Sequence, residues 1–426
     1  MISFIQADGA AEKRLLGKLK ARAGETDARV EKIVGEILHG VRSRGDVALR
    51  EYTDRFDGGL PEKWILGKDD LQAALATRDA EFVTALQNAA DNIRDFHVRQ
   101  AQQSWLTTSK DGVILGQRVR GLARVGLYVP GGTAAYPSSV LMNAIPAKIA
   151  GVEELIVVTP PFNGGANPDI LAAAAIAGVD KVYLIGGAQA VAALAYGTES
   201  VPQVDKIVGP GNIYVATAKK LVFGTADIDM IAGPSEVLVI ADETATPRFL
   251  AADLLAQAEH DMLASAILLT NSREIAEQTI GELKIQLAAL PRREIAERAL
   301  ADFGAVVVCQ DITQCLALAD EFAPEHLELS VQDPLKYIGL ADNAGSVFLG
   351  HHTPESLGDY YAGPNHVLPT GGTARFFSPL GVDSFLKKSS FIYYPKNALE
   401  AAAQDVLTLA RAEGLDAHAN TVSVRL

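Results

Sequence analysis

The feature that most constrains the fold is an alternation of two kinds of run in the middle of the chain. Short runs rich in β-branched residues, at 155–158, 182–185 and 206–208, are separated by alanine-rich runs at 170–177 and 188–195. β-Branched residues favour strands and alanine favours helices, so the alternation predicts consecutive strand–helix–strand units. Such units form a parallel sheet with helices on its faces, and ligands of these sheets bind beyond the carboxyl ends of the strands.

Two of the predicted strands end in glycine-containing loops. The loop 186–189 (Gly-Gly-Ala-Gln) follows one strand, and the loop 209–212 (Gly-Pro-Gly-Asn) follows the next. Backbone amides at the start of a helix can bind a phosphate, which favours a nucleotide ligand. However, neither loop contains the G-x-G-x-x-G dinucleotide fingerprint, and glycines in such loops also serve simply to form tight turns. The residues alone leave both interpretations open.

The chain is long enough for more than one domain, because its 426 residues exceed what a single hydrophobic core usually holds. Residues from about 8 to 120 have the three- and four-residue periodicity of helices. A second α/β section begins at residue 231, and the segment beyond residue 384 contains a β-like run at 391–394 and a helical run at 396–413. This last segment is too small to fold alone.

The composition excludes several kinds of partner and location. A formal net charge of −14 argues against nucleic acid and anionic membranes, and it leaves small molecules as the expected partners. Two cysteines do not make a disulfide framework. The N-terminus lacks the pattern of a secretory signal, and no stretch approaches the ~18 apolar residues of a membrane-spanning helix. We therefore expect a cytoplasmic protein.

One candidate for catalysis is a carboxylate beside an imidazole, Glu325 and His326, within the mostly apolar run 322–329. Histidine has the unperturbed pKa nearest neutrality, so His326 can take a proton from an alcohol, while Glu325 could activate water in a different step. Adjacent Glu-His pairs also occur by chance. The pair is therefore a candidate that needs support from other parts of the chain.

A second candidate site lies at the end of a predicted helix. Thr246 and Pro247 have the sequence of a helix start, and the last turn of this helix carries Gln257 and His260. A three-residue spacing places both side chains on the same helix face, as metal ligands require. Further imidazole and carboxylate groups follow downstream, at Asp359, His366, Glu413 and His418.

Zinc suits such a set of ligands, and a catalytic zinc leaves one position open for substrate or water. A neutral glutamine is a weak ligand that fits an exchangeable site better than a structural one. The spacing does not single out four ligands, since neither C-x-x-C nor H-E-x-x-H occurs, and each histidine could instead be a hydrogen-bonded side chain near a helix end. The pair His351-His352 is expected to be a bystander, because neighbouring side chains on an extended chain diverge.

Several long and uncommon motifs cover nearly the whole chain. They are Tyr-Val-Pro-Gly-Gly at 128–132, Gly-Gly-Ala-Gln-Ala at 186–190, Gly-Pro-Gly-Asn at 209–212, Ala-Gly-Pro-Ser-Glu-Val-Leu at 232–238, Gln-Ala-Glu-His at 257–260, Phe-Ala-Pro-Glu-His-Leu-Glu-Leu at 322–329, the segment 358–372, and Ala-Glu-Gly-Leu-Asp-Ala-His-Ala-Asn at 412–420. Together they resemble the histidinol dehydrogenase family. One departure is the segment 261–265, Asp-Met-Leu-Ala-Ser, where family members usually have a short polar turn.

The resemblance implies an enzyme that oxidises L-histidinol through L-histidinaldehyde to L-histidine with two NAD+ and one zinc ion per subunit, in the final steps of histidine biosynthesis. The acid/base residues that it implies are Glu325 and His326. The implied zinc ligands are Gln257, His260, Asp359 and His418. The implied NAD+ contacts are Tyr128, Gln189 and Asn212. The implied substrate-binding residues are the four zinc ligands together with Ser235, Glu325, His366 and Glu413.

The resemblance also implies a domain plan: an α/β fold with two Rossmann-like domains whose dinucleotide folds are incomplete, a helical N-terminal region and a small swapped C-terminal tail. Residues 1–120 and 233–380 would form one discontinuous α/β domain that carries the zinc and acid/base residues, and residues 121–232 would bind NAD+. The tail, residues 381–426, would reach the partner of a homodimer, so that Glu413 and His418 act in trans. This suits a tail that cannot fold alone.

Two alternatives come from different classes of protein. One is a related zinc-dependent dehydrogenase that acts on another small alcohol, such as a sulfonated diol. The presence of Glu325, His326, His366 and Glu413, which suit a cationic imidazole-bearing substrate, argues against it. The other is a non-catalytic metal-binding or interaction protein, and the intact set of acid/base and ligand residues argues against that.

Overall fold

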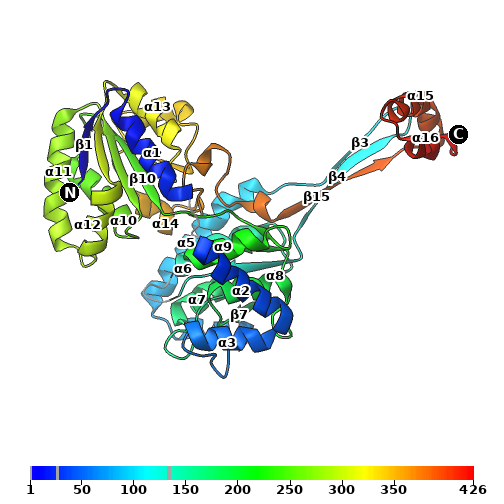
Figure 1. Cartoon of the computed structure of the whole chain (residues 1–426), viewed down its shortest axis with the longest axis horizontal. Coiled ribbons are helices and arrows are strands. Elements are labelled where there is room, and N and C mark those ends of the chain that lie inside the picture. Colours follow the sequence, from blue (N-terminus) through cyan, green and yellow to red (C-terminus); the bar gives the residue numbers. More distant parts are fainter. Residues whose placement is uncertain (1, 25–27, 132–135) are drawn as a thin grey trace.

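The structure, a computed structural model, describes residues 2–24, 28–131 and 136–426 and contains two α/β lobes and a long arm (Figure 1). The predicted α/β class is confirmed. Gly132 of the motif at 128–132 lies outside the described residues. Within the described ranges, no helix is both long and apolar enough to cross a membrane.

Lobe 1 is built on a six-stranded parallel sheet. Successive side chains of its central strand point to opposite faces, so Val237 and Val239 pack with helices on one face, whereas Leu238 and Ile240 pack with helices on the other. In spatial order the strands are β1 (Ser3–Gln6), β12 (Ala305–Val308), β11 (Ser265–Thr270), β10 (Glu236–Ala241), β13 (His326–Ser330) and β14 (Ser346–Leu349). The covering helices are α10 (Pro247–Ala258), α11 (Arg273–Ala289) and α12 (Arg293–Phe303) on one face, and α1 (Ala11–Gly24) and α13 (Ile312–Phe322) on the other.

Lobe 2 contains the second six-stranded sheet, in which the β2–β7 pair is antiparallel and the other pairs are parallel. Its strands, in spatial order, are β2 (Ile65–Leu66), β7 (Lys181–Tyr183), β6 (Glu154–Val158), β5 (Arg124–Tyr128), β8 (Lys206–Val208) and β9 (Asp227–Ile228). The helices between these strands are α6 (Pro137–Ile149), α7 (Pro168–Ala177), α8 (Gly187–Tyr196) and α9 (Ile213–Val222). The predicted strand–helix–strand units are therefore confirmed. The strand order reverses between β5 and β8, and such a switch point leaves a crevice for ligands.

We expected residues 1–120 to form one domain with residues 233–380. Most of the N-terminal helices instead pack on lobe 2. Among the described residues before 100, only β1 and α1 join lobe 1, and four helices instead share a hydrophobic core with lobe 2. Amphipathic periodicity shows that one face of a helix is buried, but it does not show which sheet buries that face. The four helices are α2 (Ala28–Arg44), α3 (Asp46–Phe56), α4 (Lys68–Ala76) and α5 (Ala80–His97).

The segment after β14 leads from lobe 1 back to lobe 2. It begins with the short helix α14 (Glu355–Tyr360), and its later residues Val367, Leu380 and Phe385 are buried in the core of lobe 2. The chain between these points therefore lies between the two lobes. Short 3-10 turns complete the described structure, at η1 (Val98–Gln100), η2 (Pro334–Leu340), η3 (Thr373–Arg375) and η4 (Val382–Phe385).

The arm is a three-stranded antiparallel sheet that carries two helices at its far end (Figure 1). The prediction of helices up to about residue 120 is wrong for residues 105–120. They form a hairpin in which β3 pairs with β4, and β15 adds to the other edge of β4, from Leu386 opposite Gly121 to Tyr393 opposite Ile114. The arm consists of β3 (Trp105–Thr108), β4 (Ile114–Gly121), β15 (Leu386–Tyr393), α15 (Lys396–Ala412) and α16 (Asp416–Ser423).

Gly209, which directly follows β8, allows the close packing at the switch point to be tested by mutation. Gly209 has a φ of +108°, and a Cβ atom there would clash with the backbone oxygen of Tyr128. We expect Gly209→Ala to lower the Tm by several degrees, since strain of roughly 1–3 kcal/mol adds to the clash. Gly151→Ala is the matched control, because Gly151 also has a positive φ (+82°) but open space around it. Equal Tm values for the two variants in differential scanning calorimetry would contradict the close approach.

Candidate active site

A cavity of ≈ 360 Å³ lies between the two lobes. From lobe 2 it is lined by Pro130 and Gly209, which follow β5 and β8, and from lobe 1 by Ser235 and His326, at the starts of β10 and β13. The cavity is therefore at the carboxyl ends of the lobe 2 strands, as is usual, but at the amino ends of the lobe 1 strands. In lobe 1 the helix α10 runs back along the sheet, so its last turn reaches the same edge.

Most of the predicted site residues meet at this cavity. Those that line it are Asn212, Ser235, Gln257, His260, Glu325, His326, Asp359 and His366. Tyr128 and Gln189 line a second cavity, which Asn212 also lines. His351, which we expected to be a bystander, lies beyond the opposite end of the lobe 1 sheet, where Ser330 is within 2.9 Å of its Nδ1 atom.

The backbone of Glu236 holds the candidate pair Glu325 and His326. Glu325 accepts a hydrogen bond from the Glu236 N–H at 2.9 Å, and the Nδ1 atom of His326 lies 3.1 Å from the Glu236 carbonyl oxygen. Because a carbonyl only accepts, Nδ1 carries a proton. The other ring nitrogen, Nε2, is buried without a hydrogen-bond partner among the described residues, and it lies 3.7 Å from the Asp359 carboxylate. Nε2 is thus the atom of His326 that is free to exchange a proton.

Burial and negative charge shift the pKa values in this region. Burial raises the pKa of Glu325 to about 8 and that of Glu355 to about 7. Burial alone would lower the pKa of His326, but the carboxylates of Glu355, Glu325 and Asp359 outweigh it and hold this pKa well above its ordinary value. Such a concentration of carboxylates is stabilised by positive charge.

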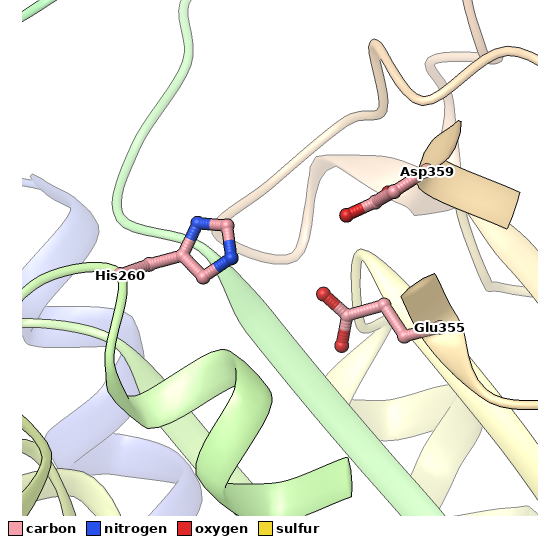
Figure 2. Close-up of side chains that lie close together, drawn as sticks. All are labelled: His260, Glu355 and Asp359. Carbon is pink, nitrogen blue, oxygen red and sulfur yellow. The ribbon is translucent and has the colours of Figure 1, made fainter. Parts of the chain in front are cut away.

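Three metal-binding side chains converge beside this pair. One ligand atom from each of His260, Glu355 and Asp359 lies within 4.8 Å of the other two, and Figure 2 shows the two carboxylates pointing toward the imidazole. His260 follows the end of α10, and Glu355 and Asp359 are four residues apart on α14, so they share one helix face. Gln257, one turn before His260, is fully buried and also lines the cavity. Imidazole, carboxylate and amide oxygen are suitable ligands for zinc.

His366 links the two lobes across the cavity. Its Nδ1 atom lies 3.0 Å from the carbonyl oxygen of Asp359, so Nδ1 donates, and its Nε2 atom accepts from the Ser139 hydroxyl of α6 at 3.2 Å. Burial lowers the pKa of His366, which keeps the ring neutral. The imidazole therefore has a defined tautomer and orientation.

Sequence reasoning did not identify Glu355 or Ser139 as parts of the site. A signal for Glu355 existed, because a carboxylate four residues before Asp359 on a short helix is a common ligand arrangement. Ser139 had no comparable signal, since one serine in a helical run of apolar residues carries no chemistry by itself. Its role depends on a contact with His366 across 227 residues of chain.

Glu413 and His418 are not at the cavity in the single chain. Glu413 caps the end of α15 and His418 lies in α16, both exposed and both at the far end of the arm (Figure 1). The small core of these helices is formed by their own residues, Leu407 and Val422 among them. Within one chain, therefore, neither Glu413 nor His418 reaches the cavity.

The second cavity, ≈ 830 Å³, is lined by Tyr128, Gln189 and Asn212 and by residues of the N-terminal helices. Asp57, which follows α3, accepts hydrogen bonds from the Gly186 N–H at 3.2 Å and from the Gln189 amide at 2.9 Å. The Gly187 N–H donates to the Tyr128 hydroxyl at 3.1 Å. The amino end of α8, where a Rossmann domain usually binds pyrophosphate, is thus already occupied by a carboxylate and a phenol.

A buried ion pair fixes the loop between the two cavities. Lys219 pairs with Asp229, and its ammonium group also donates to the Gly209 carbonyl oxygen at 2.9 Å. Asp229 in turn accepts from the Gly209 N–H at 2.7 Å. At the end of this loop Asn212 caps α9, because its side chain accepts from the Tyr214 N–H at 3.1 Å. The glycine loop is therefore held rigidly at the switch point.

Comparison with known proteins identifies the family. The family model for histidinol dehydrogenase matches residues 20–426. The histidinol dehydrogenases of Syntrophotalea carbinolica and Clostridium acetobutylicum are 56% and 52% identical to the chain, and each alignment covers 100% of it and 99% of the relative. The crystal structure of histidinol dehydrogenase from Elizabethkingia anophelis is 39% identical and superposes with a TM-score of 0.93 over 100% of this chain and 98% of that one. The chain therefore belongs to the histidinol dehydrogenase family and is an oxidoreductase of histidine biosynthesis.

Proposed function

We propose that the protein oxidises L-histidinol through L-histidinaldehyde to L-histidine with two NAD+, in a cytoplasmic, zinc-containing homodimer. The observation that carries this proposal is the shared cavity. It combines the Nε2 atom of His326, which has no hydrogen-bond partner in the described part of the chain, with the converging donors His260 and Asp359. The dinucleotide would occupy the neighbouring cavity of lobe 2, with contacts to Tyr128, Gln189 and Asn212.

The donor set supports zinc as the resident metal. His260, Asp359 and the amide oxygen of Gln257 would supply three ligands from one chain, and His418 of the partner subunit the fourth. When bound, the ion would orient the amino and imidazole nitrogens of the substrate against the nicotinamide, a positioning effect worth several kcal/mol. Ser235 and His366 line the same cavity and would contact the substrate, together with Glu413 of the partner subunit.

The arm supports a dimer in which each chain completes the site of the other. Apolar side chains along the arm are left exposed in the single chain, including Ile392 (72%), Leu409 (66%) and Val424 (68%). Exposed apolar side chains concentrated on an extended segment indicate a surface that another chain covers. A homodimer with exchanged arms would bury them.

Two adjacent residues divide the chemistry. A cation bound beside Asp359 would offset the negative charge that raises the pKa of His326. The Nε2 atom of the neutral ring would then take the hydroxyl proton as hydride leaves the carbinol carbon for the first NAD+. Glu325 would then remove a proton from the water that adds to the aldehyde, and its raised pKa makes it a stronger base than an exposed glutamate. His326 would act again in the second hydride transfer. The reaction consumes one water and leaves a carboxylate.

This division can be tested with both substrates. We expect His326→Asn to slow the oxidation of histidinol and of histidinaldehyde by roughly 10²–10⁴-fold each, because the same base serves both hydride transfers. Glu325→Gln should slow the aldehyde step far more than the alcohol step. NADH formation from each substrate in single-turnover experiments provides the measurement. Equal losses in both variants with both substrates would exclude the division.

The exchanged arm can be tested by complementation. His326→Asn and His418→Asn chains should each be inactive alone, and unfolding and refolding them together should restore about one quarter of wild-type activity. The reason is that half of the randomly formed dimers are hybrids, and each hybrid has one site with both histidines intact. If His418 served its own chain, no dimer would contain an intact site, and the mixture would stay inactive.

Asp57 holds the loop at the start of α8, next to the proposed dinucleotide site. This role can be tested by Asp57→Asn, which keeps the shape of the side chain and removes its charge. We expect the KM for NAD+ to rise about tenfold with a much smaller change in kcat, because the charge that holds Gly186 and Gln189 is lost. Glu36→Gln, in the same cavity but without a contact to that loop, is the control. Steady-state kinetics at saturating histidinol distinguishes the variants, and an unchanged KM in Asp57→Asn would refute the role.

A further inference from the structure

Glu355 is a buried carboxylate that the proposed reaction does not use. Its exposed fraction is 3%, and it lies between the proposed ligand Gln257 and the acid/base residue His326, whose Nδ1 atom is 3.9 Å from its Oε1 atom. Its backbone N–H donates to the Glu328 carboxylate at 2.8 Å, which anchors the first turn of α14. A buried carboxylate is costly unless it has specific partners, so its partners indicate its role.

The principal partner of this carboxylate is the amide of Gln257. With its nitrogen facing Glu355, Gln257 donates hydrogen bonds to both carboxylate oxygens, at 3.1 and 3.3 Å. The opposite orientation would place the amide oxygen against two acceptors, so the hydrogen-bond network selects the first. In that orientation the amide oxygen of Gln257 points away from Glu355, and Gln257 lines the same cavity as His260 and Asp359.

We propose that Glu355 is a positioning residue of the metal site, which binds the NH2 group of Gln257 and thereby presents its oxygen to the cation. This inference rests on the proposed zinc function. A neutral amide is a weak ligand, and only its oxygen can coordinate. A carboxylate on its NH2 group prevents rotation of the amide and makes the oxygen more electron-rich, as partners of metal ligands commonly do.

The competing possibility is that Glu355 coordinates the metal itself, because its carboxylate also lies near His260 and Asp359 (Figure 2). Two hydrogen bonds from one amide engage both of its oxygens, which favours the positioning role. The two roles make different predictions when Gln257 is absent. A positioning residue then has nothing to orient, whereas a ligand still binds the metal.

The test is a double-mutant cycle on zinc affinity in the full-length protein, measured by competition with a chromophoric chelator. We expect Glu355→Gln to weaken zinc binding by roughly 10–100-fold. In the Gln257→Ala background the same change should have little further effect. Glu259→Gln is the matched control, since it removes one negative charge next to His260 and leaves the backbone hydrogen bond from Glu259 to the Gln257 carbonyl oxygen unchanged, and it should leave the affinity near that of wild type.

Spectra of the cobalt-substituted protein provide a second readout. Glu355→Gln and Gln257→Ala should shift the visible absorption bands in the same way, because both alter the same ligand. If Glu355→Gln does not fold, as judged by circular dichroism, Glu355→Asp replaces it in the cycle, since the shorter side chain keeps the charge but cannot reach both amide hydrogens.

Two results would overturn the inference while the zinc function stands. The first is a Glu355→Gln protein that binds zinc as tightly as the wild type. The second is that Glu355→Gln weakens zinc binding as much in the Gln257→Ala background as in the wild type, which would make Glu355 a ligand. A wild-type protein that binds no zinc would overturn the proposed metal function itself, and the inference with it.

Discussion

The parallel pairing of β10 with β13 is the contact on which the rest of the site depends. The register places Val237 opposite His326, and the backbone of the neighbouring residue, Glu236, then holds both acid/base side chains. One peptide group donates to Glu325 and another accepts from His326, so the pair is oriented by main chain that cannot rotate. Catalytic groups require this kind of support, because small displacements cost large factors in rate.

The second constraint is the meeting of two sheets at one cavity. Lobe 2 contributes the loops at its switch point, and lobe 1 contributes the opposite ends of its strands together with the end of α10. This arrangement explains the missing dinucleotide fingerprint. A Rossmann domain needs its glycines so that phosphate can approach the start of a helix, whereas here Asp57 and Tyr128 already occupy the amides of Gly186 and Gly187.

The arm shows where local pattern fails. Residues 105–120 carry no strong alternation, yet they form the β3–β4 hairpin, and β15, more than 260 residues later, pairs with the other edge of β4. The N-terminal helices are a similar case. Their apolar stripes predicted burial correctly, but the choice of lobe depends on packing against α6, α7, α8 and α9, which no single helix encodes. Both errors concern contacts between elements, which the pattern within one segment does not specify.

The sequence by itself determined the α/β class, the strand–helix–strand order of lobe 2 and eight of the residues that line the cavity, because periodicity and rare motifs are local properties. Tertiary structure decided which groups meet. It placed Glu355 against Gln257 and Ser139 against His366, and it held Glu413 and His418 away from their own cavity. Contacts of this kind depend on how whole elements pack, and the free energy that selects them is shared among many buried side chains rather than stored in any short segment.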